Sequence, residues 1–284
     1  MDSHSSAPSG VRDSLDLTAR VAVITGGSGL LGVRHAEAIA EMGGIPVLLD
    51  IESQSVSQRA DEIATAYGVP AMGLVADITQ PEQISSALHQ ILDAFGRVDI
   101  LINNAANNPK VENGITGSHW SRLENFPLDV WSQDILIGLT GAFLCSQTIG
   151  GELARRGHGV ILNIASDLAL IGPDQRIYRQ GGVPEEQQFV KPVTYSVVKS
   201  GLLGLTRYLA TYWADKGVRV NSISPGGVRN QQDEAFVERL TNLIPLGRMA
   251  RSDEYKAAIV FLVSDASSYM TGANLVIDGG RTAW

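Results

Sequence analysis

Tyr195 and Lys199 stand four residues apart in the stretch TYSVVKSGLLGLTRYLATYWA (194–214), whose apolar residues recur with helical spacing. Residues four apart on a helix lie on one face, so the ammonium group of Lys199 can reach the neighbourhood of the phenol. A phenol with an ordinary pKa of about 10 is a poor base at neutral pH, but nearby positive charge favours its anion. The pair is therefore a candidate for general acid–base catalysis, and two residues that merely lie one turn apart are the alternative.

A glycine-rich turn follows the first predicted strand, in VAVITGGSGLLGVRHAEAIA (21–40). Gly27, Gly29 and Gly32 fit the pattern G-x-G-x-x-G, in which glycines permit a tight turn and the approach of a pyrophosphate to a helix N-terminus. A lone match of this kind is weak. The strand before it and the helix after it favour dinucleotide binding over a chance turn.

Asp50 ends the second predicted strand, IPVLLD (45–50). A carboxylate at this place can accept hydrogen bonds from an adenosine ribose and repel a 2′-phosphate. Glu52 adds to the repulsion, and no Arg or Lys stands at 50–54 to bind that phosphate. The sequence therefore favours NAD over NADP, with an Asp that caps the next helix as the alternative.

The elements that must position these residues alternate along the chain. Strands are predicted at 20–25, 45–50, 71–77, 98–106, 159–166, 218–225 and 274–280, and helices at 30–42, 53–67, 81–95, 129–155, 194–215 and 253–264. The first strands are continuous apolar runs, as expected when helices cover both faces of a parallel sheet. We predict an α/β fold: one Rossmann domain (17–284) with a doubly wound, parallel seven-stranded sheet, after a disordered leader (1–16).

Composition limits the class of partner. The chain of 284 residues carries a net charge of −8 and has no run of Lys or Arg, which argues against nucleic acid or an anionic membrane and favours a small-molecule substrate. Its single cysteine, Cys145, has no companion for a disulfide or a metal site. No apolar run approaches the ~20 residues of a transmembrane helix, and the N-terminus has no apolar signal segment. We expect a cytoplasmic protein without a metal.

Two segments, 107–128 and 171–193, interrupt the regular spacing. Long insertions are often lids or binding loops, and both follow predicted strand ends, where ligands bind in open sheets; ordinary surface excursions are the alternative. Four basic residues could bind a phosphate or carboxylate of a substrate: Arg176, Arg179, Lys191 and Arg229. Solvated loop charge is the alternative, offset by Asp174, Glu185 and Glu186.

The sequence resembles the short-chain dehydrogenase/reductase family over essentially everything from Leu17 onward. The matching motifs stand in family order: TGGSGLLG (25–32), Asp50, ADI (76–78), NNAA (103–106), NIAS (163–166), YSVVK (195–199) and SPGGV (224–228). Most are weak individually. Together, in register on predicted strand ends, they are a strong signal.

The resemblance implies a catalytic role for three residues. Ser166 would orient the substrate oxygen, Tyr195 would exchange its proton, and Lys199 would act on the phenol and hold the nicotinamide ribose. Tyr178 is a competing tyrosine inside the 171–193 segment. Gly182 stands four residues after it, where a lysine would be needed, so Tyr195 is preferred.

The resemblance also implies the cofactor NAD and the residues that bind it: Gly26, Ser28, Gly29, Leu31, Asp50, Ile51, Asp77, Ile78, Asn104, Ala105, Tyr195, Lys199, Pro225, Gly226 and Val228. The apolar helices 129–155 and 194–215 carry more hydrophobic surface than one sheet face needs, which predicts a homo-oligomer. Members of the family usually form tetramers through these helices.

Three residues depart from the family pattern. Gly138 stands where an asparagine normally offers its backbone carbonyl, in a local kink, to a proton-relay water. Glycine keeps the carbonyl, so we expect the relay to survive and Gly138→Asn to leave the pH dependence unchanged. Leu30 replaces a glycine of the short branch, whose assignment we keep because the chain is too short for the extended branch's substrate domain. Asn230 replaces a threonine that contacts the cofactor amide.

These expectations converge on an NAD(H)-dependent oxidoreductase that interconverts a secondary alcohol and a ketone by acid–base catalysis and hydride transfer. The stretches GPDQRIY (172–178), KPVTYSVVK (191–199) and GRMARSDEYK (247–256) resemble members linked to bacterial surface-sugar or flagellin-glycan biosynthesis, which points to a sugar or phosphorylated sugar. The alternatives are an NAD-dependent sugar epimerase or dehydratase, and a dinucleotide-binding regulator without catalysis.

Overall fold

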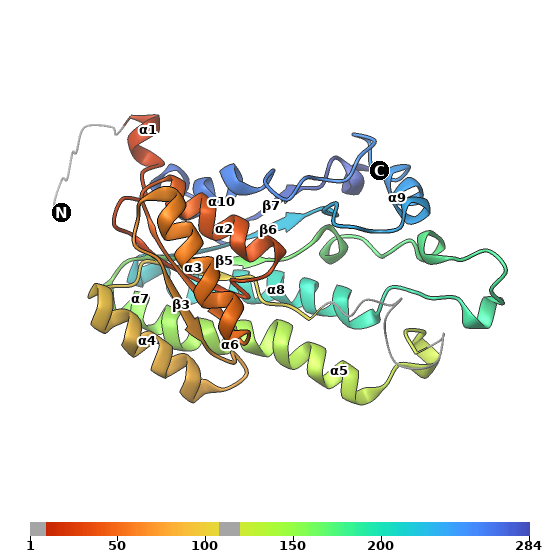
Figure 1. Ribbon diagram of the computed structural model, residues 1–284, viewed down its shortest axis with the longest axis horizontal. Helices are drawn as coiled ribbons and strands as arrows, with labels where there is room; N and C mark the ends of the chain where they lie inside the picture. The colour runs from red at the N-terminus through yellow and green to blue at the C-terminus, as the bar shows by residue number, and fades with distance from the viewer. Residues whose placement is uncertain (1–9, 108–119) are drawn as a thin grey trace.

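A parallel sheet forms the centre of the molecule (Figure 1). The computed structural model describes residues 10–107 and 120–284. Its seven strands lie in the order β3-β2-β1-β4-β5-β6-β7, and every pairing is parallel. The strands are β1 Val21–Thr25, β2 Ile45–Asp50, β3 Met72–Val75, β4 Ile100–Asn103, β5 Gly159–Ile164, β6 Val218–Pro225 and β7 Asn274–Ile277. The predicted fold class is confirmed.

The sheet is buried on both faces because its strands are continuous apolar runs. In β1 all five residues are buried, and alternate side chains serve the two faces. Ala22 and Ile24 belong to one core cluster, whereas Val21 and Val23 belong to the other. Burial of apolar surface stabilises a fold by about 25 cal/mol per Å². The two apolar layers are therefore the main source of stability.

Helices cover the two faces in separate layers (Figure 1). One layer contains α2 Leu30–Glu41, α3 Ser53–Tyr67 and α10 Lys256–Val263, which contribute to the first cluster. The other contains α4 Pro81–Phe95, the helix 128–156 and α8 Val193–Tyr212, which contribute to the second. Short 3₁₀ turns are η2 Leu123–Asn125, η5 Asp167–Ala169, η6 Gln175–Tyr178, η7 Glu185–Gln187, η8 Ala214–Lys216, η9 Asp265–Ser267 and η10 Arg281–Ala283.

The long helix is a composite of α-helical and π-helical pieces. It consists of α5 Leu128–Ile135, η3 Leu136–Thr140, α6 Gly141–Cys145, η4 Ser146–Gly150 and α7 Gly151–Arg156, of which η3 and η4 are π-helical. By length and composition this element could cross a membrane, since its most apolar 18-residue window has a mean hydropathy of 1.2. The expectation that no apolar run approaches the length of a transmembrane helix is therefore contradicted by length and composition. In the structure the element packs against α4, α8 and β5.

Two further elements differ from the prediction. The short helix α1 Val11–Ser14 lies inside the segment expected to be a disordered leader, so ordered structure begins before Leu17. Residues 1–9 of that leader lie outside the described residues. The helix α9 Glu234–Thr241 was not predicted, because its eight residues carry a short and weakly apolar pattern.

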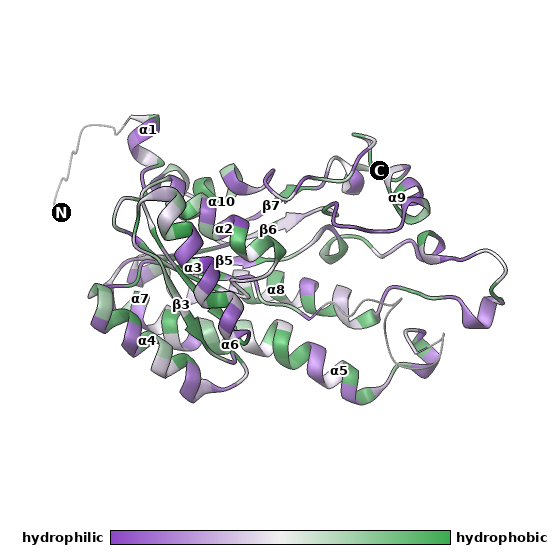
Figure 2. Ribbon diagram, viewed as in Figure 1, coloured by the Kyte–Doolittle hydropathy of each residue, from purple (hydrophilic) through white to green (hydrophobic). Residues whose placement is uncertain are grey.

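The 171–193 segment is anchored by a third, small core. Ile177 packs with Leu240, Ile244 and Met249, next to α9. Gln188 closes the loop, because its side chain accepts from the Gln180 amide at 2.8 Å and donates to the Gln180 carbonyl at 2.9 Å. The tip around η7 is hydrophilic (Figure 2). Most of the other irregular segment, 108–119, lies outside the described residues.

Candidate active site

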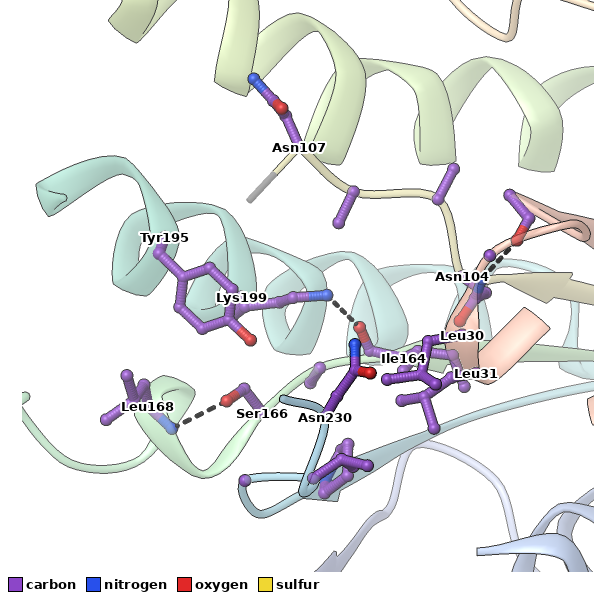
Figure 3. A pocket seen from close by; sticks show the side chains of 18 of the residues that line it. Leu30, Leu31, Asn104, Asn107, Ile164, Ser166, Leu168, Tyr195, Lys199 and Asn230 are labelled. Carbon is purple, nitrogen blue, oxygen red and sulfur yellow. Dashed lines mark hydrogen bonds between the residues drawn. The ribbon is translucent and has the colours of Figure 1, made fainter. Parts of the chain in front are cut away.

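A cavity of about 1100 Å³ lies at the carboxyl ends of the strands. The connections that follow β1 and β4 lead to opposite faces of the sheet, and this divergence opens a crevice between the two strands. The ends of β1, β2, β4, β5 and β6 all contribute to its lining. Residues far apart in sequence therefore meet in one place (Figure 3).

The glycine turn forms one end of the cavity. Gly26 has φ +61°, a left-handed conformation that favours glycine. A Cβ at Gly32 would lie 2.1 Å from the Gly26 carbonyl oxygen, so only glycine fits there. The Asn104 side chain donates to the carbonyls of Thr25 and Gly26 at 3.0 and 3.1 Å, which ties β4 to the turn. Gly29 is the N-cap of α2 and provides no side-chain cap, so the first amides of the helix stay available to an anion.

Asp50 lies beside this turn. Its Oδ2 accepts from the amide of Ser28 at 3.0 Å and from its hydroxyl at 2.5 Å, and its Oδ1 accepts from the Ile51 amide at 2.8 Å. The alternative that Asp50 caps the next helix is wrong, because the N-cap of α3 is Glu52. Asp50 lines the cavity, so its carboxylate is in place for a ribose.

Ser166, Tyr195 and Lys199 lie together at the other end of the cavity (Figure 3). The hydroxyl of Tyr195 points toward Ser166, which lies two residues after β5 and caps η5. Nζ of Lys199 donates to the carbonyl of Ile164 at 2.7 Å and lies 5.9 Å from the centroid of the Tyr195 ring. A second ammonium, that of Lys191, lies 3.9 Å from the same centroid. The arrangement brings a phenol, a hydroxyl and two cations together.

The pKa of Tyr195 is raised, which is opposite to the sequence expectation. Burial is the main cause; a hydrogen bond with Ser166 acts in the other direction, and the charge of Asp167 raises the pKa further. Burial also lowers the pKa of Lys199 to about 8, with a smaller contribution from Lys191. The phenol of the chain alone therefore needs alkaline pH, or additional positive charge, to act as a base.

Every predicted site residue except Ser28 lines this cavity: Gly26, Gly29, Leu31, Asp50, Ile51, Asp77, Ile78, Asn104, Ala105, Ser166, Tyr195, Lys199, Pro225, Gly226 and Val228. Ser28 does not line the cavity but donates two hydrogen bonds to Asp50, which does. The sequence reasoning missed Asp167 and Arg281, which also line the cavity. The only signal for Asp167 was a charge directly after a buried strand end, and Arg281 had none.

The predicted basic group does not gather at the cavity. Arg176 pairs with Asp174 at 2.7 Å, Arg179 pairs with Glu185 at 2.9 Å, and Arg229 pairs with an exposed glutamate; none of the three lines the cavity. Only Lys191 does. The alternative of solvated, paired loop charge is therefore correct for the three arginines.

Comparison with known proteins agrees with this geometry. The family profile described as "Enoyl-(Acyl carrier protein) reductase" matches residues 28–282. The NAD-dependent glycerol dehydrogenase of Listeria innocua is 32% identical over 278 residues, which cover 96% of this chain and 98% of the relative. The NADP-dependent mannitol dehydrogenase of Hypocrea jecorina is 32% identical, with 95% of each chain covered. A short-chain type dehydrogenase/reductase from Mycobacterium marinum has a TM-score of 0.82 at 32% identity, with 97% and 100% coverage.

The chain belongs to the short-chain dehydrogenase/reductase family. It is thus an oxidoreductase of a family that acts on CH–OH groups with a nicotinamide dinucleotide. The residues present fit such a cofactor: uncapped amides of α2 face a pyrophosphate position, Asp50 faces a ribose position, and Lys199 lies at the opposite end.

The three residues of this short-chain dehydrogenase/reductase that depart from the family pattern lie in different surroundings. Leu30 is 44% exposed and lines the cavity, so its larger side chain is accommodated at the cavity edge. Asn230 points toward the end of Lys199 (Figure 3). Gly138 lies in the π-helical segment η3, and a Cβ there would lie 2.6 Å from Cγ1 of Val198. A side chain at Gly138 would therefore require Val198 on α8 to shift, and the survival of the proton relay stays a prediction.

Proposed function

We propose that this protein is an NAD-dependent dehydrogenase that interconverts a secondary alcohol and a ketone on an unphosphorylated polyol or sugar. The observation that carries the proposal is the meeting of Ser166, Tyr195 and Lys199 in one cavity that continues to the glycine turn and Asp50. A single cavity with an acid–base group at one end and a dinucleotide cradle at the other suits hydride transfer.

Side chains of the protein would accept the proton from the substrate hydroxyl and stabilise the charge that develops on its oxygen. When bound, the nicotinamide supplies the acceptor for the hydride that leaves the carbinol carbon. Tyr195 takes the hydroxyl proton of the substrate, and the hydroxyl of Ser166, which donates to Asp167 in the free chain, turns its proton to the substrate oxygen as charge develops there. Lys199 holds the ribose of the cofactor and, with Lys191, places positive charge beside the phenol.

The choice of NAD rests on the charges along the cavity. The cationic residues that line it are Lys191, Lys199 and Arg281, among the described residues. All three lie at the catalytic end, whereas the adenosine end presents the carboxylate of Asp50. A 2′-phosphate would meet repulsion there without a compensating cation. The names of the relatives include both NAD- and NADP-dependent enzymes, so the argument depends on this chain's residues.

The choice of an unphosphorylated polyol rests on the lining near Tyr195. Polar groups that line the cavity include Tyr178, Asn230, Gln231, Gln232 and Asp233, which suit hydroxyl groups of a substrate. The three arginines that could have bound a phosphate are paired elsewhere. Relatives named for glycerol and mannitol support the same substrate class.

A panel of polyols and sugars, incubated with NAD and followed by absorbance of reduced cofactor, tests the proposal. Net NADH with an unphosphorylated polyol supports it, and Tyr195→Phe should lower kcat at least ~100-fold because the base is lost. Tyr178→Phe is the control, since Tyr178 lines the same cavity but Gly182, not a lysine, stands four residues after it, and it should keep most of the kcat. Product without net NADH would instead indicate an epimerase or dehydratase, and cofactor binding alone would indicate a regulator.

A further inference from the structure

A buried ion pair lies directly behind Ser166. Oδ2 of Asp167 accepts from Nη1 of Arg281 at 3.1 Å, and the side chains are only 5% and 8% exposed. Oδ1 of Asp167 accepts from the hydroxyl of Ser166 at 2.7 Å and from the amide of Leu168 at 2.8 Å. Asp167 and Arg281 both line the cavity that contains Tyr195. The two charges are thus connected to the reacting groups and not to the protein surface.

Arg281 is held in this position by the C-terminal turn. Asp278 accepts from the amides of Gly280 at 2.9 Å and Thr282 at 2.8 Å, which shapes the turn that begins η10. The indole of Trp284 donates to the carbonyl of Leu243 at 3.2 Å and fastens the end of the chain. A guanidinium fixed in this way is preorganised to pair with one carboxylate.

We propose that Asp167 and Arg281 are positioning residues for catalysis: Asp167 orients the hydroxyl of Ser166, and Arg281 offsets the carboxylate charge beside Tyr195. The inference deepens the proposed function and rests on it for the effect on turnover. A lone buried carboxylate next to the catalytic phenol would oppose formation of the phenolate, because like charges repel at short range in a desolvated site. The positive charge of Arg281 offsets most of this repulsion, and Asp167 still accepts the hydrogen bond from Ser166.

Other ionisable groups near the site also contribute to the electrostatic potential at Tyr195 and at the Asp167–Arg281 pair. Those near the phenol are Lys191, Lys199 and, across a small neighbouring cavity, Asp134. Those near the pair are Tyr255, which feels the charge of Asp167, and Asp174, which feels the charge of Arg281. None of them hydrogen-bonds to Ser166 in the described part of the chain, so the pair is the direct neighbour of that hydroxyl.

Opposite pH shifts are expected when the two charges are removed separately. Asp167 disfavours the phenolate, so Arg281→Gln should move the acid limb of the kcat/KM profile for alcohol oxidation, where activity rises with pH, up by about one pH unit, and Asp167→Asn should move it down. The double variant should fall between the two single variants. The pKa of Tyr195 should show the same order among the variants. It is measured by ultraviolet difference absorbance, with Tyr195→Phe added to each variant as the reference.

The absorbance titration keeps the inference separate from the proposed function. If the wild type oxidises no polyol, the proposed function fails, while the order of the Tyr195 titrations still decides the role of the pair. Arg59→Gln is the control, because it breaks an exposed Arg–Glu pair on α3 and should shift nothing. If Arg281→Gln and Asp167→Asn lower thermal stability but leave both pH curves unmoved, the pair is merely structural and the inference is overturned.

Discussion

At the scale of the residue, one carboxylate is expected to determine the coenzyme. Asp50 is positioned by three hydrogen bonds of 3.0 Å or less, two from Ser28 and one from Ile51. It therefore presents a fixed negative charge where the adenosine ribose of a dinucleotide would lie. Glu52, two residues later, is exposed and makes no cap hydrogen bond, so its charge is free to move away.

Asp50→Asn should lower the preference for NAD over NADP. The amide keeps the shape and an acceptor for Ser28 but removes the charge that repels a 2′-phosphate. We expect the ratio of kcat/KM values for NAD and NADP to fall about 10-fold, equivalent to ~1.4 kcal/mol. Steady-state kinetics with both cofactors measures it, and Glu52→Gln is the control. An unchanged ratio in Asp50→Asn would show that this carboxylate does not select the coenzyme.

At the scale of the element, the composite helix and α8 depend on glycines where they touch. Val198 precedes Lys199 on α8 and packs where Gly138 has no side chain. Valine is β-branched and has little rotamer freedom in a helix, so it cannot turn away from an added Cβ. The contact explains why a glycine in the middle of a helix is tolerated despite its unfavourable propensity.

Gly138→Ala should lower the free energy of unfolding by about 1–3 kcal/mol through overpacking, and should reduce kcat because α8 carries both Tyr195 and Lys199. Val198→Ala in the same chain should restore most of both. Gly151→Ala is the matched control, since a Cβ there meets nothing within 4 Å, and it should be neutral or slightly stabilising. Chemical denaturation provides the measurement, and a destabilisation as large in Gly151→Ala would rule out the contact as the cause.

At the scale of the whole molecule, the helices on one face leave apolar groups uncovered. Leu136 and Phe143 on the composite helix are 37% and 46% exposed, and Tyr208 and Tyr212 on the neighbouring α8 are 62% and 60% exposed. The two tyrosine rings stack with centroids 5.7 Å apart. Only 28% of the most apolar window of the composite helix is buried within the chain. Such a surface is typical of an interface between subunits.

We therefore expect a homo-oligomer that buries these helices, and expect Phe143→Glu with Tyr212→Glu to reduce its assembly state. Light scattering after size-exclusion chromatography measures the mass directly. Val11→Glu is the control, because Val11 is 79% exposed on α1 and belongs to another surface. A wild-type protein that is monomeric at high concentration would contradict the expectation.

The local pattern of the sequence was sufficient for the strands, most helices and the Tyr195–Lys199 pair, whereas Ser166 came from the family resemblance. Apolar runs and helical periodicity are short-range signals, and they predicted all seven strands in place. Three of the sites lie at predicted strand ends: the glycine turn, Asp50 and Ser166. Tyr195 and Lys199 lie on one face of a predicted helix. Once a parallel sheet is inferred, its geometry brings such positions to one edge.

Tertiary structure alone decided which charges meet. Asp167 and Arg281 are 114 residues apart, and nothing local marks them as partners. Arg176 and Arg179 looked like substrate ligands until their carboxylate partners and directions were visible. The direction of the Tyr195 pKa shift also depends on burial, which only the packed chain defines. The physical reason is the same in each case: spacing along the chain fixes secondary structure, whereas charge, burial and pairing at a site depend on contacts between distant segments.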